Sequence, residues 1–272
     1  MKIIIMTDLE GVAGVITYHG WANAEGRYFE QSRMLLAMEV NAAVDGFFAA
    51  GATDIVVADG HGGGGFGGVN AVCLDKRVRF QRGWPDGPYP LGLDKSFDAV
   101  AVVGQHAKAG TEYAHIAHTQ SFKVLDLSVN GISIGEFGQL TLCAGELGVP
   151  VIFGSGDQAF CKEAQALVPG IETVAVKQGL ASGTGEECPP DDYGRRNNAA
   201  VHLHPELARH LIRQGAEKAV QRHRKEKFGI VKLIPPYEWV CIYRSDGTNP
   251  QKKIVHTHPD SVIGVMNMPY RK

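Results

Sequence analysis

The sequence predicts an α/β fold, a mostly parallel sheet sandwiched by helices, with a smaller C-terminal α+β domain. Short apolar runs at 3–6, 55–58 and 97–104 have the length and the β-branched content of buried strands. A segment with helical spacing of apolar residues, 27–50, lies between the first two runs and ends at Gly51. Strands that alternate with helices favour a parallel sheet covered on both faces.

The alternation continues to about residue 180. Residues 122–129 and 132–134 are predicted to pair as a hairpin, because Asn130-Gly131 between them is a typical two-residue turn. Asp157 is the expected N-cap of a helix. The remaining helices and strands of this part are expected over 137–147, 148–154, 157–167 and 173–176.

The alternation of strands and helices stops at 181–198. This segment is rich in glycine, proline and aspartate and is the best candidate for a domain boundary or a functional loop. The sequence therefore predicts a metal-binding catalytic domain over residues 1–190 and a smaller C-terminal domain over residues 191–272. In the second part a helix is expected from Pro205 to about Lys227. Short strands are expected over 238–243 and 253–255.

Composition argues against several classes of protein. With 27 basic and 29 acidic residues and a net charge of −2, the chain has no electrostatic footprint for nucleic acid. No apolar run is long enough for a transmembrane span, and Thr7-Asp8 interrupts the apolar start too early for a signal peptide. The cysteines are 5 in number without a C-x-x-C pair, which indicates reduced thiols. We expect a cytoplasmic protein without nucleic-acid or membrane partners.

Titratable side chains follow the predicted strands at their carboxyl ends. Asp8 and Glu10 come after the first strand and are two residues apart, so an extended backbone points them to the same side. His61, His106 and Glu136 occupy equivalent positions after later strands. Open α/β sheets collect their ligands outside the carboxyl ends of the strands, so these five side chains are expected in one crevice.

The donor set indicates a metal site. Imidazole and carboxylate ligands suit zinc, with manganese or cobalt as alternatives. Five ligands exceed what one tetrahedral zinc needs, whereas a carboxylate bridging two ions divides them into two open sites, the arrangement used for metal-assisted hydrolysis. For Asp8 taken alone, the capping of a turn is an equally good explanation.

Several segments resemble the DppA-type D-aminopeptidases, zinc peptidases that remove D-amino acids from the amino termini of peptides. The match runs in order along the chain as several blocks rather than one short motif. Its segments are Thr7–Gly11, Asp59–His61, Gly104–Ala109, Ala117–Thr119, Asn130–Gly131 with Gly135–Gly138, and Ala175–Gln178.

The resemblance implies two zinc ions per subunit and a role for each candidate residue. In these roles Asp8 bridges the two ions, Glu10 and His61 complete one site, His106 and Glu136 complete the other, and His118 is the catalytic histidine. The resemblance also implies a small peptide as substrate. Assembly into a large homo-oligomer of stacked rings, decamer-like, is implied in the same way.

Other patterns leave alternatives open. His115 competes with His118 for the catalytic role, because the segment before His118 is one residue longer than in the family pattern. Lys177 follows a predicted strand and either binds a substrate carboxylate or oxyanion or lies on the surface. Asp59 is interpreted as a carboxylate that orients the ligand His61.

The predicted metal site does not account for some patterns in the sequence. The pairs His202-x-His204 and His256-x-His258 are interpreted as surface histidines, because neither has a carboxylate at a matching strand end. The glycine-rich loop 62–68 lacks the Gly-Lys-Ser/Thr of a phosphate loop. Two other functions stay open, a metal-dependent binding protein without turnover and a different metal-dependent amide hydrolase.

Overall fold

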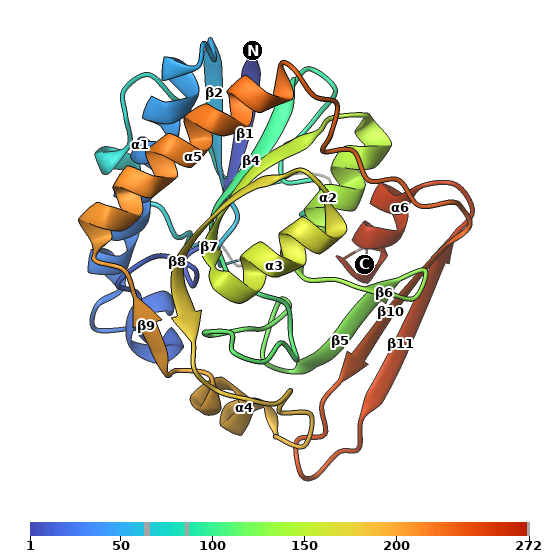
Figure 1. Cartoon of the computed structure of the whole chain (residues 1–272). Coiled ribbons are helices and arrows are strands. Elements are labelled where there is room, and N and C mark those ends of the chain that lie inside the picture. Colours follow the sequence, from blue (N-terminus) through green and yellow to red (C-terminus); the bar gives the residue numbers. More distant parts are fainter. Residues whose placement is uncertain (63–65, 85–86, 271–272) are drawn as a thin grey trace.

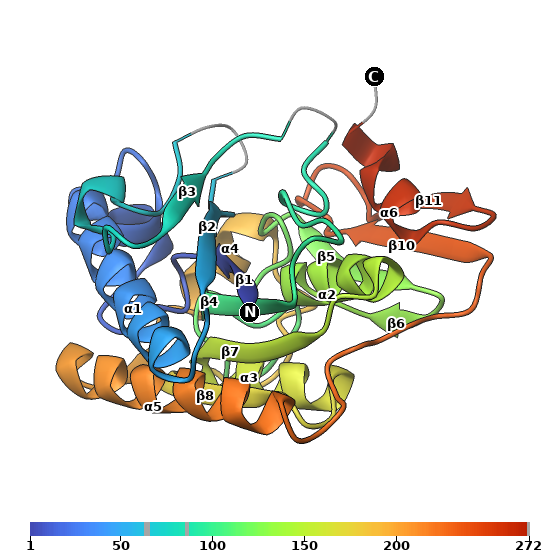
Figure 2. The same ribbon diagram turned by 90° about the horizontal axis from the view of Figure 1, so that it is seen from above.

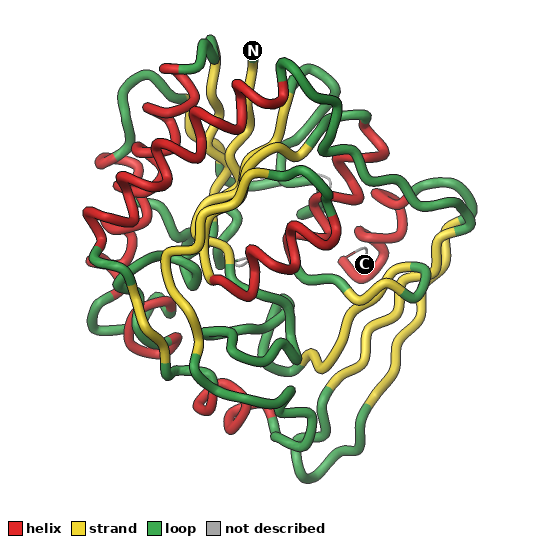
Figure 3. Tube along the Cα trace, viewed as in Figure 1, coloured by secondary structure: helices red, strands yellow, loops and turns green. Residues whose placement is uncertain are grey.

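A seven-stranded sheet organises the larger part of the molecule (Figures 1 and 3). The computed structural model describes residues 1–62, 66–84 and 87–270. In spatial order the strands are β3 (Arg79–Gln81), β2 (Asp54–Asp59), β1 (Lys2–Thr7), β4 (Ala99–Gln105), β7 (Val151–Asp157), β8 (Glu172–Gly179) and β9 (Ala200–His202). Neighbouring strands run parallel, except that β9 is antiparallel to β8. The predicted α/β class with a mostly parallel sheet is confirmed.

Helices cover both faces of this sheet. The alternation of side chains along β1 sends Ile3 and Ile5 into one core cluster and Ile4 and Met6 into the other. The first cluster is closed by α1 (Phe29–Ala49) and α5 (Pro205–His223), and the second by α2 (Glu136–Leu147) and α3 (Gln158–Leu167) (Figure 1). Because both faces are buried, the ends of the strands are the places where this sheet can present polar side chains.

A second sheet of four antiparallel strands packs beside α2 (Figure 2). Its order is β11 (Lys252–His258), β10 (Tyr237–Tyr243), β5 (Val124–Val129) and β6 (Ile132–Ser133). The predicted hairpin is confirmed, since β5 pairs with β6 and both turn residues, Asn130 and Gly131, have positive φ. A third core cluster joins this sheet to α2 and to α6 (Val262–Asn267).

The C-terminal third of the chain contributes to both sheets. β9 and α5 belong to the seven-stranded layer, whereas β10 and β11 extend the sheet that begins with β5 and β6. The predicted boundary at residue 190 falls at the start of a short helix, α4 (Pro190–Arg196), and does not coincide with a division between the sheets. The division into two domains stays a prediction of the sequence.

Several predicted elements differ from the observed ones at their ends, and for two of them a local contact explains the difference. The strand expected from residue 148 starts at Val151, because Gly148 ends α2 with a left-handed φ of 77°. The helix expected to reach Lys227 ends at His223, where the N–H groups of Lys225 and Glu226 both turn to the carbonyl of Arg222. Within the described ranges, every helix is too short or too polar to cross a membrane.

Candidate metal centre

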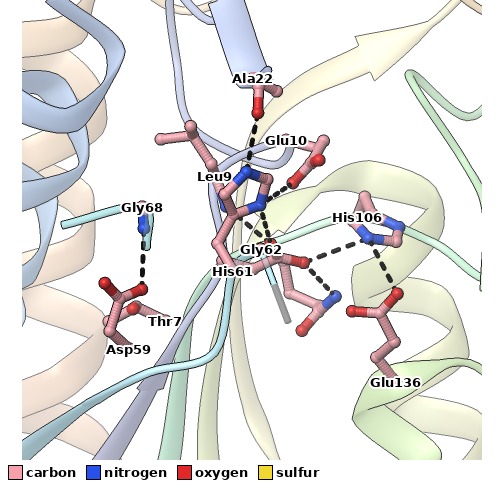
Figure 4. Close-up of polar contacts among 12 residues, drawn as sticks. Thr7, Leu9, Glu10, Ala22, Asp59, His61, Gly62, Gly68, His106 and Glu136 are labelled. Atoms are coloured by element: carbon pink, nitrogen blue, oxygen red, sulfur yellow. Dashed lines mark hydrogen bonds and ion pairs between the residues drawn. The ribbon is translucent and has the colours of Figure 1, made fainter. Parts of the chain in front are cut away.

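The loops after three adjacent strands carry four of the predicted ligands. Asp8 and Glu10 follow β1, His61 follows β2, and His106 follows β4. Since β1 lies between β2 and β4, these three strand ends are neighbours. The fifth residue, Glu136, is the first residue of α2. The structure brings all five together, and Figure 4 shows Glu10, His61, His106 and Glu136 converging.

The carboxylate of Asp8 lies between two groups of side chains. Its Oδ1 is 3.1 Å from Nδ1 of His61, and the same nitrogen is 3.1 Å from Oε2 of Glu10. Its Oδ2 is 3.1 Å from Nε2 of His106, which in turn is 3.7 Å from Oε1 of Glu136. Each oxygen of Asp8 therefore faces one histidine that is paired with one glutamate.

Main-chain carbonyls orient the two histidines. Nε2 of His61 is 2.7 Å from the carbonyl oxygen of Ala22, and Nδ1 of His106 is 2.9 Å from that of Ala107. If these nitrogens carry the only proton of each ring, the other nitrogen has a free lone pair on the side of the carboxylates, where it could bind a metal ion. The interpretation of Asp59 as the orienting group of His61 is wrong, because its carboxylate instead accepts the N–H groups of Gly68 and Val69.

Burial and charge make this centre suitable for a cation. Asp8, Glu10 and His106 are at most 3% exposed. Burial by itself would lower the pKa of His106, but the carboxylates of Asp8 and Glu136 outweigh it and raise this pKa to about 10. Among the described residues, Oε2 of Glu10 and Nε2 of His106 have no hydrogen-bond partner of acceptable geometry. A divalent ion would satisfy these atoms and balance the carboxylates, and histidine with carboxylate is a donor set that zinc accepts.

Two N–H donors hold the carboxylate of Asp8 in place. The side-chain N–H of Gln105 donates to Oδ2 of Asp8 at 2.8 Å, and the N–H of Leu9 donates to Oδ1 at 2.8 Å. Gly104 has a left-handed φ of 79°, and a Cβ at this position would lie 2.1 Å from the carbonyl oxygen of Asp8. Only glycine permits this approach between the end of β4 and the loop that follows β1.

A cavity of about 650 Å³ opens over the predicted ligands. His118 lines it, with Nδ1 2.8 Å from the carbonyl oxygen of Ile116 and Nε2 3.9 Å from Oε1 of Glu136. Burial and the neighbouring His106 lower the pKa of His118 to about 3, so that its imidazole is neutral at neutral pH. His106, His118 and Glu136 offer nitrogen or oxygen atoms within 4.8 Å of one another, which puts His118 within reach of a metal as well as of the cavity.

His115 and Lys177 lie behind the loop that follows β1 and do not line this cavity. His115 is fully buried, and its Nε2 is 2.9 Å from the carbonyl oxygen of Ile16. Burial lowers the pKa of His115 to about 2. Lys177 is 3% exposed and donates to the carbonyl oxygen of Val15, so it is not a surface lysine. Both side chains support the loop rather than face a substrate.

The two histidine pairs also lie apart from the cavity. His202 is half-buried, and its Nδ1 accepts the N–H of Gly14. The exposed His204 caps α5, and His256 and His258 are half-buried on the edge strand β11. In the loop 62–68, Gly62 and Phe66 line the cavity, whereas residues 63–65 lie outside the described residues.

Sequence reasoning missed several residues of the cavity wall. They are Tyr18, Arg82, Trp84, Tyr89, Gln120 and Tyr270. These residues come from loops and from the C-terminal segment, and no motif or strand end marks them. The contact of Gln105 with Asp8 was also missed, although the position of Gln105 directly before His106 was the available signal.

Comparison with known proteins places this architecture in a family. A family model described as D-aminopeptidase matches residues 1–248. The chain belongs to the D-aminopeptidase family. This confirms the resemblance drawn from the sequence and extends it beyond residue 180, and as a member of the D-aminopeptidase family the chain is a metallo-aminopeptidase.

The sequence match and the solved structure that are similar to this chain are both D-aminopeptidases from Bacillus subtilis. One, a D-aminopeptidase of strain 168, is 28% identical over 200 residues, which are 72% of this chain and 70% of the relative. The other is the solved structure of the Zn-dependent D-aminopeptidase DppA, described as a self-compartmentalizing protease. It superposes with a TM-score of 0.84 at 23% identity and covers 99% of this chain and 96% of that chain, which confirms the fold.

Proposed function

We propose that the chain is a zinc-dependent aminopeptidase that hydrolyses N-terminal D-amino acids from short peptides or amides by a two-metal mechanism. The observation that carries the proposal is the position of Asp8, whose two oxygens face two separate histidine–glutamate pairs. Membership of the D-aminopeptidase family and the zinc dependence in the description of the superposed relative support it. The preference for the D configuration rests on the family and on nothing in the site's geometry.

The proposal assigns each ligand residue to one or both of two zinc sites. Asp8, Glu10 and His61 would hold one zinc ion, and Asp8, His106 and Glu136 would hold the second. Zinc bound here supplies polarisation of the scissile carbonyl and a more acidic water. The donor atoms are held by Leu9, Gln105 and the orienting carbonyls, so that little reorganisation accompanies binding.

His118 acts as the acid–base group in this proposal. Its Nδ1 is engaged by the carbonyl of Ile116, so the proton on that side holds the ring and leaves Nε2 available. Nε2 lies on the cavity side, near Glu136, where it can take up a proton and return it to the departing amine. Stabilisation of an oxyanion and direct attack on the carbonyl are the alternative roles of the same atom.

We also propose that the protein works as a large homo-oligomer of stacked rings, decamer-like, in the cytoplasm. The self-compartmentalizing description of the superposed relative supports the assembly, and the five free cysteines are in keeping with a reducing compartment. Sedimentation of the zinc-loaded protein tests the assembly, and a monomer would contradict it.

Turnover of a panel of D- and L-aminoacyl amides and dipeptides by zinc-loaded protein tests the function. We expect two zinc ions per chain by metal analysis and hydrolysis of the D substrates. Two zinc ions without hydrolysis of any amide would instead favour a metal-dependent binding protein. Hydrolysis of amides that lack a free amino terminus would favour a different amide hydrolase.

A further inference from the structure

We propose that Tyr89, Gln120 and Tyr270 form a specificity wall that hydrogen-bonds an oxygen of the substrate and limits the length of the peptide. The inference deepens the proposed function and rests on it. All three residues line the cavity above the metal centre. The wall lies beside Glu136, because the main-chain N–H of Gln120 donates to Oε1 of that residue at 2.7 Å.

The side chain of Gln120 connects the two tyrosines. Its Nε2 is 2.8 Å from the hydroxyl of Tyr89, and its Oε1 is 3.2 Å from the hydroxyl of Tyr270. Gln120 has a left-handed φ of 63°, which turns its main-chain N–H to Glu136 while its side chain spans the hydroxyls. Both the main chain and the side chain of this residue are therefore held at one end of the cavity.

The hydrogen bonds between Gln120 and the two tyrosines leave one tyrosine hydroxyl proton without an acceptor among these three residues. A contact at the amide nitrogen of Gln120 uses an amide proton, and a contact at the amide oxygen uses a tyrosine proton. In either orientation of the amide group, the two hydrogen bonds use the hydroxyl proton of one tyrosine. The hydroxyl proton of the other tyrosine has no acceptor among these three residues. A donor of this kind at the cavity surface suits an acceptor oxygen of a peptide, either a carbonyl or a C-terminal carboxylate.

The wall is anchored from behind by α6. The side chain of Asn267 accepts the N–H of Tyr89 at 3.2 Å and donates to its carbonyl oxygen at 2.8 Å. Asn267 is 4% exposed and Tyr89 is 6% exposed, so this connection is buried. A wall with such support resists displacement by an entering chain.

Tyr270 forms the outer edge of the wall. Its side chain is 46% exposed, and the match to the family model ends at residue 248. This edge therefore lies outside the part of the chain that the family model matches. Each added residue lengthens an extended peptide by roughly 3.3–3.6 Å, so a ring held across its path discriminates against long substrates.

Peptide length preference tests the wall. The measurement is kcat/KM for a dipeptide and a tetrapeptide with the same N-terminal D-residue, for the zinc-loaded wild type and two variants. Tyr270→Ala removes the ring, and Gln120→Asn shortens the bridge while keeping a residue that accepts positive φ. We expect the tetrapeptide-to-dipeptide ratio to rise about tenfold in Tyr270→Ala and less in Gln120→Asn, mainly through KM, with zinc content unchanged.

Tyr113→Ala is the control, since Tyr113 is a tyrosine of similar exposure to Tyr270, at 49% against 46%, has positive φ like Gln120 and does not line the cavity. The control should keep the wild-type ratio. An unchanged ratio in both folded wall variants overturns the inference while leaving the proposed function intact. If Tyr270→Ala does not fold, the tetrapeptide-to-dipeptide ratio of Gln120→Asn alone tests the inference. A wild type that cleaves neither peptide overturns the proposed function, and the wall with it.

Discussion

The imidazole of His118 stacks on that of His106, with ring centroids 4.0 Å apart and planes inclined by 13°. Tyr18 and Phe122 enclose His118 further, with centroid distances of 6.3 and 5.0 Å. These contacts hold the ring of a cavity-lining residue against the ring of a proposed metal ligand. The position of His118 is thus set by packing as well as by its hydrogen bond to Ile116.

His118→Ala should lower the turnover number by roughly a hundredfold to ten-thousandfold, the usual range for an acid–base group. Zinc content and folding should stay at the wild-type level, because Asp8, His106 and Glu136 remain in place. Paired measurement of zinc content and turnover checks this. Loss of one zinc ion in the variant would make His118 a ligand, as its distance to Glu136 also allows.

His115→Ala should affect stability more than chemistry. Its imidazole is fully buried against the loop after β1, so truncation leaves a cavity and an unpaired carbonyl at Ile16. We expect a free energy of unfolding lower by about 2 kcal/mol, with turnover within a few-fold of wild type. Abolished turnover in this variant, together with near-normal turnover in His118→Ala, would move the acid–base role to His115.

Asp8→Ala should remove at least one zinc ion and nearly all activity, because both proposed sites share this carboxylate. The metal-free variant is expected to be less stable than the metal-free wild type, because the N–H groups of Leu9 and Gln105 and the two histidines lose the buried carboxylate that they contact. Metal analysis after dialysis checks the first expectation. Asp260→Ala is the control for loss of a carboxylate, because that side chain is 80% exposed. A stoichiometry of two zinc ions in Asp8→Ala contradicts the bridging role.

Gly104→Ala should destabilise the protein and reduce its zinc content. The new Cβ would lie 2.1 Å from the carbonyl oxygen of Asp8, so the end of β4 and the loop after β1 must separate. Gly148→Ala is a matched control, with φ of 77° against 79° and no atom within 4 Å of the added Cβ. We expect about 1 kcal/mol for the control, the cost of a left-handed alanine, and at least twice that for Gly104→Ala. Equal losses of unfolding free energy in Gly104→Ala and Gly148→Ala would show that the close approach of Gly104 to Asp8 does not require glycine.

Glu39 should make stability depend on pH. Its side chain is 2% exposed and accepts the N–H of Ala13, and burial raises its pKa from 4.5 to about 7, against the opposing influence of Lys177 and Arg209. Below pH 4.5 the carboxyl is protonated in both states. As the pH rises to about 7, the unfolded chain ionises first, so the wild type loses stability.

Glu39→Gln lacks this titration and keeps an acceptor for Ala13. The unfolding free energy of the wild type relative to the variant should therefore fall by up to about 3 kcal/mol between pH 4.5 and 7. Denaturant unfolding at constant zinc and protein concentration measures the difference across this range. Parallel profiles for the two proteins would mean that Glu39 ionises normally in the folded state.

The sequence was sufficient for the fold class and for the convergence of five polar side chains. Buried parallel strands show as short apolar runs, and their carboxyl ends meet at one edge of a sheet whatever the details of packing. Asp8, Glu10, His61 and His106 could be placed together because each follows such a run directly. Glu136 was also predicted to join them, from the hairpin signal that precedes it, but it follows β6 of the antiparallel sheet and begins α2, so the rule on parallel strand ends does not explain its position.

Only the tertiary structure separated His118 from His115 and assembled the cavity wall. Ile116 has a left-handed φ of 52°, which a β-branched residue rarely adopts and no propensity predicts. The chain turns there, so that His115 enters the interior and His118 reaches the cavity. Gln120 and Tyr270 are 150 residues apart, and their contact depends on how the C-terminal segment packs over the loops. Local sequence determines strand ends, whereas contacts between distant loops depend on the packing of the whole chain.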